Sequence, residues 1–186
     1  LLPLGPTFSK LGQLRSTRPD ILPPAYIDVL SSLQDDVPPA PWAESQNVLE
    51  EELGPVDEAF DDFDREPISG ASLGQVYTAT YDGEPVAVKV RRPGIESLVE
   101  ADLRVVKWSL PLIKRFIGQG RAFSLENLAD EFAKTIRQEM DYGRERRVLE
   151  TIRERFEGDE TIRIPSPIPE VSGGRFLTKE YIGRTK

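Results

Sequence analysis

Hydrophobic and polar residues alternate most regularly near the middle of the chain, and this pattern predicts antiparallel strands. Asp82-Gly83 is a favoured two-residue turn for a hairpin between two of them. The strands are expected at about 67–69, 74–82 and 84–91. Side chains of 84–91 alternate between two faces, one carrying Val86, Val88 and Val90 and the other carrying Ala87 and Lys89. One face is therefore lined by valines, and the other presents a single lysine.

Apolar residues recur at helical spacing on both sides of these strands. Pro111 is expected to bend or break one helix, Ser124 to cap the longest one, and Gly54 to end another. One predicted helix begins near Pro24, and three others span about 42–53, 95–117 and 124–156. Two more strands are predicted at 162–168 and 175–182.

The order of strand, strand, strand, helix, strand, strand is that of the N-terminal lobe of a protein kinase. We expect an α+β fold, in which a five-stranded antiparallel sheet packs against the long helix and is covered by helices of an N-terminal extension. The extension would occupy 1–65 and the lobe 66–183, with a helical insertion at 95–117. The chain would then stop at the hinge, before the other lobe of such a kinase.

The amino-acid composition limits the kinds of site and partner that the protein can have. The 186 residues include no Cys and no His, which excludes disulfides, thiolate metal sites and the commonest general base. A net charge of -8 argues against nucleic acid as the main partner, because phosphate binding needs a basic face. Arg outnumbers Lys by 17 to 7. Such an acidic, lysine-poor composition suits the high-salt cytoplasm of a halophile, and an ordinary acidic cytosolic protein fits the charge equally well.

No apolar run is long enough for a transmembrane segment, so none is predicted. The expected location is the cytoplasm, with peripheral contact to a membrane left open.

A loop of small residues from Ser69 to Gly74 is followed, about fifteen residues later, by Lys89. Small side chains let backbone N–H groups approach phosphate oxygens, and a strand lysine supplies positive charge to the same phosphates. The three positions of a G-x-G-x-x-G loop read Ser69, Ala71 and Gly74 here, and alanine disfavours the positive φ angles that glycine adopts. Lys89 alone would be interpreted as a solvated strand lysine. Its place after the loop favours a nucleotide site.

Two further groups carry little information by themselves. Asp141 and Glu145 lie one turn apart on the predicted long helix, whereas Glu139 lies well round from Asp141. A solvated charged face is the default explanation for such a run. Lys10 and Gln13 are also one turn apart, but tetrapeptides of this kind are common.

Taken together, these pieces form an ordered set of motifs. The chain resembles the UbiB/ADCK family of atypical kinase-like proteins, from about Leu4 to Gly183. Six motifs carry the resemblance, beginning at Phe8 (FSKLGQ), Ser16 (STRPDILP), Leu33 (LQDDVPP), Ala71 (ASLGQV), Val86 (VAVKVRRPG) and Glu139 (EMDY). Six motifs in the family's order make chance agreement very improbable.

The resemblance implies a regulatory role for four residues. Lys10 and Gln13 match the family's Lys-x-Gly-Gln motif, on an extension that folds over the nucleotide site and blocks the place of a protein substrate. Glu139 and Asp141 match its Glu-x-Asp motif, which contacts the extension and bears on metal–nucleotide binding. A buried Lys10 beside these two acids would offset the cost of their desolvation.

The resemblance also implies a nucleotide site. Lys89 and Glu145 match the catalytic lysine and the helix glutamate that pairs with it. Backbone groups of about 180–182 would meet adenine at the hinge. The residues implied in cofactor binding are Ser69, Gly70, Ala71, Ser72, Gly74, Gln75, Val76, Ala87, Lys89, Glu180 and Ile182. No metal ligand is assigned within the chain.

By resemblance, the protein would bind ATP with Mg²⁺ and act as an ATPase or unorthodox kinase that supports isoprenoid-quinone or other lipid metabolism. A lipid or a membrane-associated biosynthetic complex is the expected partner. The alternative is a pseudokinase-like module that binds nucleotide or lipid and regulates without phosphoryl transfer. Without a catalytic loop, the chain is expected to be inactive on its own.

Overall fold

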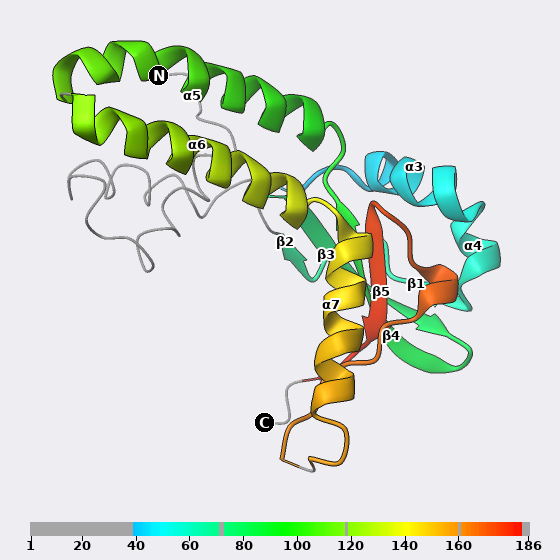
Figure 1. The fold of residues 1–186 in the computed structure, drawn as a ribbon. Coiled ribbons are helices and arrows are strands. Elements are labelled where there is room, and N and C mark those ends of the chain that lie inside the picture. Colours follow the sequence, from blue (N-terminus) through cyan, green and yellow to red (C-terminus); the bar gives the residue numbers. More distant parts are fainter. Residues whose placement is uncertain (1–38, 71–72, 118, 160, 184–186) are drawn as a thin grey trace. The chain divides into compact units, whose positions relative to one another are not determined.

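The computed structural model describes residues 39–183, with gaps at 71–72, 118 and 160 (Figure 1). The described residues fall into two compact units, one comprising 94–138 and the other comprising 39–93 together with 139–183. The helix predicted near Pro24 lies outside the described residues, and so do Lys10 and Gln13.

A five-stranded antiparallel sheet forms the centre of the larger unit, which confirms the predicted fold class. β3 (Gly74–Tyr81) and β4 (Glu84–Arg91) pair along their whole lengths. The strand order is β1-β3-β4-β5, with β1 at Asp62–Phe63 and β5 at Phe176–Glu180, while β2 (Ser69–Gly70) pairs with β3 (Figure 1).

The turn between β3 and β4 is the one that its two residues predict. Asp82 has a φ of 52° and Gly83 a φ of 75°, so both central residues are in the left-handed region that a type I′ hairpin turn requires. Tyr81 then pairs with Glu84 at the start of the ladder.

One strand prediction was wrong, and one strand was not predicted. Residues 162–168 form no strand, and they contribute a single bridge in which Pro167 pairs with Lys179. Pro165 and Pro167 lack the N–H group that a ladder needs. The fifth strand is instead β1, which has two residues and is too short to show an alternating pattern.

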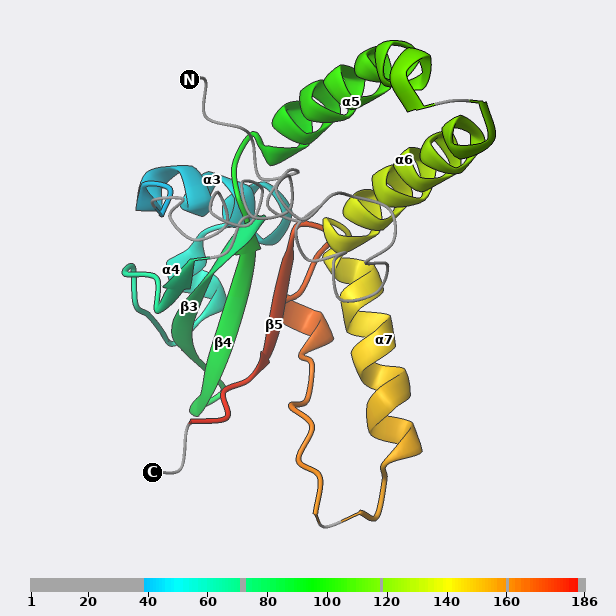
Figure 2. The same cartoon turned by 90° about the vertical axis from the view of Figure 1, so that its left-hand side faces the viewer.

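Helices of the larger unit cover both faces of the sheet (Figure 2). α3 (Trp42–Leu53) packs against β4, and the short α4 (Val56–Ala59) follows it. α7 (Tyr142–Arg155) packs against β5, and the single 3₁₀ turn η2 (Pro169–Val171) also contacts this strand. The predicted 42–53 helix is confirmed to the residue, and its C-cap is Gly54 with a φ of 81°.

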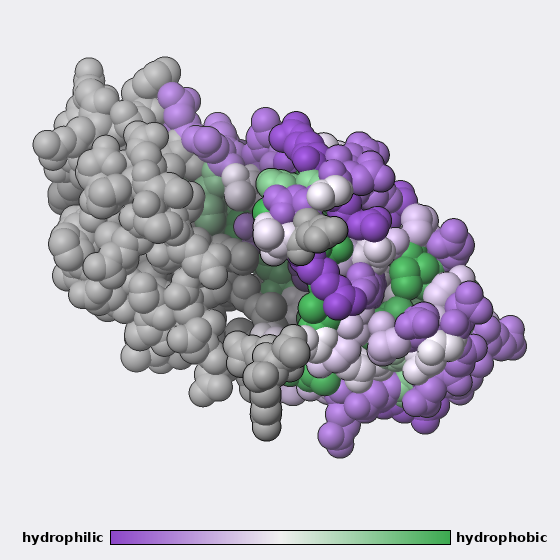
Figure 3. Space-filling model, turned by 90° about the horizontal axis from the view of Figure 1, so that it is seen from below, coloured by the Kyte–Doolittle hydropathy of each residue, from purple (hydrophilic) through white to green (hydrophobic). Residues whose placement is uncertain are grey.

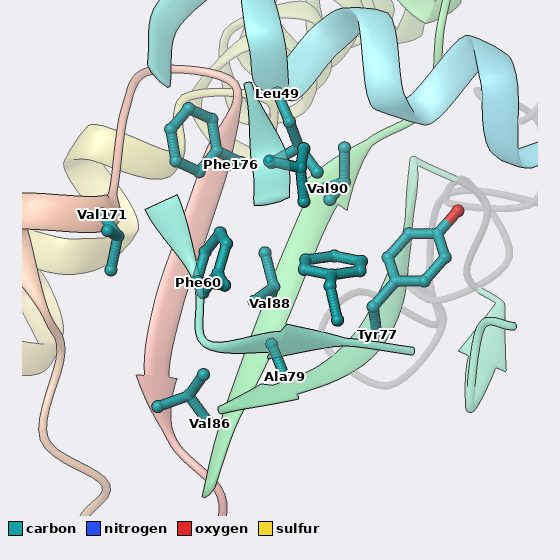
Figure 4. Packing of buried hydrophobic residues seen from close by; sticks show 11 residues of the cluster. Leu49, Phe60, Tyr77, Ala79, Val86, Val88, Val90, Val171 and Phe176 are labelled. Carbon is teal, nitrogen blue, oxygen red and sulfur yellow. The ribbon is translucent and has the colours of Figure 1, made fainter. Parts of the chain in front are cut away.

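The core lies between the sheet and the α3–α4 layer. Trp42, Phe63 and Tyr77 form an aromatic group there, with ring centroids 5.0 to 5.6 Å apart. The fully enclosed apolar side chains of this cluster are Leu49, Val56, Phe60, Phe63, Tyr77, Ala79, Val86, Val88, Val90, Val171 and Phe176 (Figure 4). The three valines that share one face of β4 are therefore part of the core.

The smaller unit is a pair of antiparallel helices, α5 (Ile95–Ile117) and α6 (Gln119–Glu139). Two exposed ion pairs join them, Arg137 with Glu100 and Lys107 with Asp130. Pro111 lies inside α5 and does not end it. The expected Ser124 cap was wrong, since Ser124 lies inside α6.

The predicted long helix to Phe156 is also wrong, because it is interrupted at Met140 and Asp141, where α6 ends and α7 begins. Asp141 is the N-cap of α7, and its carboxylate accepts a hydrogen bond of 2.9 Å from the Arg144 N–H. A side chain that caps a helix start competes with helix continuation, which explains the break.

The described residues on the face shown in Figure 3 are mainly hydrophilic, with separate apolar patches among them. Three of the exposed apolar side chains, Val148, Ile152 and Phe156, follow one another at four-residue spacing along α7. Within the described part of the chain, no helix combines the length and the apolar character that crossing a membrane requires.

Candidate functional site

Lys89 and Glu145 form an ion pair on the sheet face opposite the aromatic core. The Lys89 Nζ and Glu145 Oε2 atoms are 2.6 Å apart, although 56 residues separate them in the sequence. Lys89 projects from β4 and Glu145 from the first turn of α7. The two side chains are 28% and 36% exposed, so the pair is partly shielded from water and still open to a ligand.

Tyr142, the first residue of α7, holds this pair against the sheet. Its ring centroid lies 4.5 Å from the Lys89 Nζ, a cation–π contact, and the residue is 1% exposed. Burial raises the pKa of the Tyr142 hydroxyl, and the neighbouring Glu145 carboxylate raises it further. The hydroxyl therefore stays protonated and neutral at physiological pH.

Gly74 makes room for this tyrosine. A Cβ atom at Gly74 would lie 2.3 Å from the Tyr142 hydroxyl and 2.7 Å from the Val90 carbonyl oxygen. Such distances are far inside van der Waals contact, so only glycine allows α7 to approach β3 here. The small residue at 74 thus has a packing reason, which the sequence analysis did not find.

The predicted phosphate loop, 69–74, includes β2 and the first residue of β3. β3 pairs with β4, the strand that carries Lys89. Ser69 and Gly70 form β2, where Ser69 pairs with Val76 and Gly70 with Gln75. Ala71 and Ser72 lie outside the described residues. Gly70 is exposed and has open space where a Cβ would stand, so its surroundings do not require a glycine.

Two of the predicted cofactor-binding residues share the face of Lys89. Val76 lies directly opposite Lys89 in the β3–β4 ladder, and Ala87 lies two residues before it on β4. Because side chains alternate along a strand, both project away from the aromatic core. The structure therefore brings Val76, Ala87, Lys89 and Glu145 together.

The side chain of Gln75 lies on the other face. It is fully buried, and its amide Nε2 contacts the Tyr77 hydroxyl and the Ser45 Oγ, the latter at 2.8 Å. Its Oε1 accepts a hydrogen bond of 2.9 Å from the Ala40 N–H. This side chain attaches the segment before α3 to β3, so a contribution of Gln75 to nucleotide binding would come from its backbone.

Glu139 and Asp141 lie on either side of the helix break, and not on one continuous helix as expected. Glu139 is the last residue of α6 and is exposed. Asp141 caps α7 and lies 3.7 Å from the Arg147 guanidinium. Because the helix is broken between them, these two acids do not have the regular helical spacing that the sequence suggested.

Glu180 is the last residue of β5, and Ile182 follows it by two residues. The Glu180 N–H donates to the Ser166 carbonyl at 2.8 Å, and the Tyr181 N–H donates to the Pro85 carbonyl at 3.1 Å. The Glu180 carboxylate binds Arg163, and this hydrogen bond lowers its pKa. Both N–H groups are thus already paired, so contacts with adenine would have to come from other backbone groups of 180–182.

Sequence reasoning missed two further residues at this site. Tyr142 was seen only as part of a motif, although an aromatic residue three positions before Glu145 shares its helix face. Arg91 lies two residues after Lys89 on the same strand face, and its Nη1 donates to the Met140 carbonyl at 3.2 Å. No cluster of three or more acidic side chains within the described part of the chain could hold a metal ion.

Comparison with known families decides the identity of this fold. The family model for the ABC1 atypical kinase-like domain matches residues 32–186. The chain belongs to the ABC1 family of atypical kinase-like proteins. This result confirms the UbiB/ADCK resemblance, and the kinase-like sheet and helix described above are those of an ABC1 domain.

Similar ABC1 proteins occur in plants and cyanobacteria. The Arabidopsis thaliana protein named ACTIVITY OF BC1 COMPLEX KINASE 8, chloroplastic, is 42% identical over 98% of this chain and 24% of its own length. An uncharacterised protein of Synechocystis is 37% identical over 98% of this chain and 46% of its own length. The chain thus spans less than half of the length of either curated relative.

A solved structure shares the ABC1 fold. It is the Mycobacterium tuberculosis protein determined in complex with erythromycin, which superposes with a TM-score of 0.67 at 25% identity. The match covers 93% of this chain and 44% of that protein.

Proposed function

We propose that the whole protein binds ATP with Mg²⁺ on the sheet face that carries Lys89, and acts as an ATPase or unorthodox kinase. The Lys89–Glu145 ion pair of 2.6 Å supports this proposal most strongly. In protein kinases a strand lysine paired with a helix glutamate contacts the nucleotide phosphates. The ABC1 membership of the chain agrees with it.

Each residue at this face has a distinct part in the proposal. Glu145 holds the Lys89 ammonium in one orientation, and the Tyr142 ring supports it from the side of the helix. A fixed ammonium stabilises phosphate charge without having to reorganise when the charge develops. Val76 and Ala87 provide an apolar surface beside it, suited to a flat adenine ring.

The described residues supply the phosphate-facing half of such a site. Mg²⁺ would neutralise phosphate charge, and we assign none of its ligands to the described residues. Ala71, which stands at a glycine position of the G-x-G-x-x-G pattern, would limit the conformations of the backbone around the phosphates. Support of isoprenoid-quinone or other lipid metabolism, in contact with a membrane-associated complex, is the process that we propose for this activity.

The test compares wild-type whole protein with Lys89→Ala in ATP binding by calorimetry and in ATP hydrolysis. Removal of one preorganised charge costs about 100-fold in kcat in comparable sites. We therefore expect Lys89→Ala to lower the kcat of ATP hydrolysis by about 100-fold. Lys134→Ala is the matched control, because Lys134 is an exposed lysine of α6, and it should leave both quantities unchanged.

Equal hydrolysis by wild type and Lys89→Ala would end the role proposed for Lys89. ATP binding that depends on Lys89, without measurable hydrolysis, would instead favour a regulatory module that binds nucleotide. Absence of ATP binding by the wild type would overturn the proposal as a whole.

A further inference from the structure

The turn of residues 173–175, which precedes β5, contacts α3, β4 and α7 of the larger unit. On one side it binds two acidic residues at the end of α3, and on the other it binds the first residue of α7. It lies directly before Phe176, where β5 begins. The turn therefore connects the helix layer on one face of the sheet with the helix that carries Glu145.

The contact with α3 consists of charge-assisted hydrogen bonds. The Arg175 Nε lies 2.5 Å from Glu52 Oε1, and its Nη1 lies 2.6 Å from Glu51 Oε2. The Gly174 N–H donates to the other Glu52 oxygen at 3.0 Å. Arg175 and Glu52 are 28% and 29% exposed, so this pair is as shielded as the Lys89–Glu145 pair.

Gly173 has a steric reason to be glycine. A Cβ atom there would lie 2.1 Å from the Glu52 carboxylate and 2.7 Å from the Phe176 ring. The close approach of α3 to the turn thus depends on the residue at 173 as well as on the charges.

The contact with α7 sets the point at which this helix begins. The first N–H groups of a helix have no partner within it, and that of Tyr142 donates to the Gly174 carbonyl at 3.1 Å. The neighbouring Arg175 carbonyl accepts from the Arg91 N–H at 2.8 Å. Arg91 also binds the Met140 carbonyl through its side chain. The turn and Arg91 together hold the start of α7 at the sheet.

We propose that Arg175, Glu51 and Glu52 are positioning residues, which hold the start of α7 so that Tyr142 and Glu145 meet Lys89. Release of the turn would allow the first turn of α7 to move, and a displacement of about 1 Å is enough to break a hydrogen bond. The expected change in nucleotide affinity rests on the function proposed above. The expected change in the position of α7 is independent of that function.

The experiment uses Arg175→Gln, with Arg163→Gln as the control, because Arg163 forms an ion pair with Glu180 near the C-terminal end of α7 and not at its first turn. Hydrogen exchange of the amides of 142–146 reports the position of α7 without any nucleotide. Arg175→Gln should speed this exchange about tenfold relative to wild type, while the β3–β4 hairpin keeps its protection. Arg163→Gln should change neither.

ATP affinity supplies the second measurement, made on the whole protein. Arg175→Gln should weaken ATP binding about fivefold, an effect of about 1 kcal/mol, and should have no further effect in a Lys89→Ala background. Unchanged exchange of 142–146, a uniform rise that includes the β3–β4 hairpin, or an equal affinity loss in the Lys89→Ala background would each overturn the positioning role. If Lys89→Ala binds ATP as well as the wild type, the role proposed for Lys89 fails; if the wild type binds no ATP, the proposed function fails; in both cases the exchange measurement still decides the positioning role.

Discussion

The two faces of the β3–β4 hairpin differ in what they require of a side chain. One face contacts α3 and α4 and consists of enclosed aromatic and aliphatic residues around Tyr77 and Val88. The other face contacts the start of α7 and consists of Gly74, Lys89 and the residues that meet them. Val88 and Lys89 are adjacent in the sequence, yet only the first is part of the apolar core.

This difference shows how one strand can carry stability and chemistry at the same time. Alternation along a strand separates neighbouring residues by the thickness of the sheet, so each face is free to vary with little effect on the other. The apolar face contributes free energy of unfolding, whereas the face of Lys89 holds a partly exposed ion pair that adds little stability. Substitutions on the two faces should therefore have separable effects.

The largest expected effect is on the apolar face. Phe60→Ala removes a side chain that is 4% exposed and whose ring centroid lies 5.3 Å from that of Phe63. It should lower the free energy of unfolding, measured with urea, by about 3–5 kcal/mol. Phe156→Ala, at a 43% exposed position, should change it by no more than about 0.5 kcal/mol.

If the faces are separable, Phe60→Ala should also leave the ATP affinity of the folded protein unchanged. A loss of affinity comparable to that of Lys89→Ala would show that the two faces are coupled.

An intermediate effect is expected where α7 meets β3. Gly74→Ala places a Cβ atom against the Tyr142 hydroxyl and should cost about 1–3 kcal/mol of stability by forcing the helix away. Gly70→Ala is the control, since the space around Gly70 is open, and it should be nearly neutral. Urea unfolding measures both variants.

Tyr142→Phe removes the clashing hydroxyl and should recover part of the loss, because the Val90 carbonyl remains close. The two substitutions should therefore be non-additive by about 1 kcal/mol in a double-mutant cycle. Strict additivity would mean that Tyr142 does not determine the residue at 74.

The smallest effect concerns alkaline pH. Burial raises the pKa of Tyr142 above the usual 10.0, so the folded protein keeps a proton that the unfolded chain loses. Stability from this group is complete below pH about 10 and falls as pH rises further, because the unfolded state then binds fewer protons. Tyr142→Phe should show a shallower decline of the unfolding free energy as pH rises above about 10. Equally steep declines would show that Tyr142 is not a source of the alkaline sensitivity.

The hairpin could be predicted because its signals are local. Alternating valines and the Asp82-Gly83 turn determine β3 and β4 without reference to the rest of the fold. β1 could not, since its two residues pair with β3 through a contact that no local pattern records. The strand predicted at 162–168 failed because its apolar residues suggested alternation while its prolines removed the donors.

The candidate site was predicted in part, since Lys89, Glu145, Val76 and Ala87 were named from the sequence and Tyr142 and Arg91 were not. Lys89 and Glu145 were identified by their motifs, and their contact is a finding of the structure. Tyr142 packs against Gly74, and Arg175 binds Glu51 and Glu52 more than 120 residues away, and such contacts leave no regular spacing in the sequence. The helix break was missed because acidic caps and acidic helix faces look alike before Asp141 is seen bound to the Arg144 N–H.

The break at Met140–Asp141 has a consequence for natural variation in length. In an unbroken helix, each residue inserted or deleted before Glu145 would rotate its side chain by about 100° around the axis. Because α7 starts afresh at the Asp141 cap, its rotation is independent of the number of residues in α5 and α6. Residues can therefore be inserted into or deleted from the α5–α6 hairpin during evolution without turning Glu145 away from Lys89.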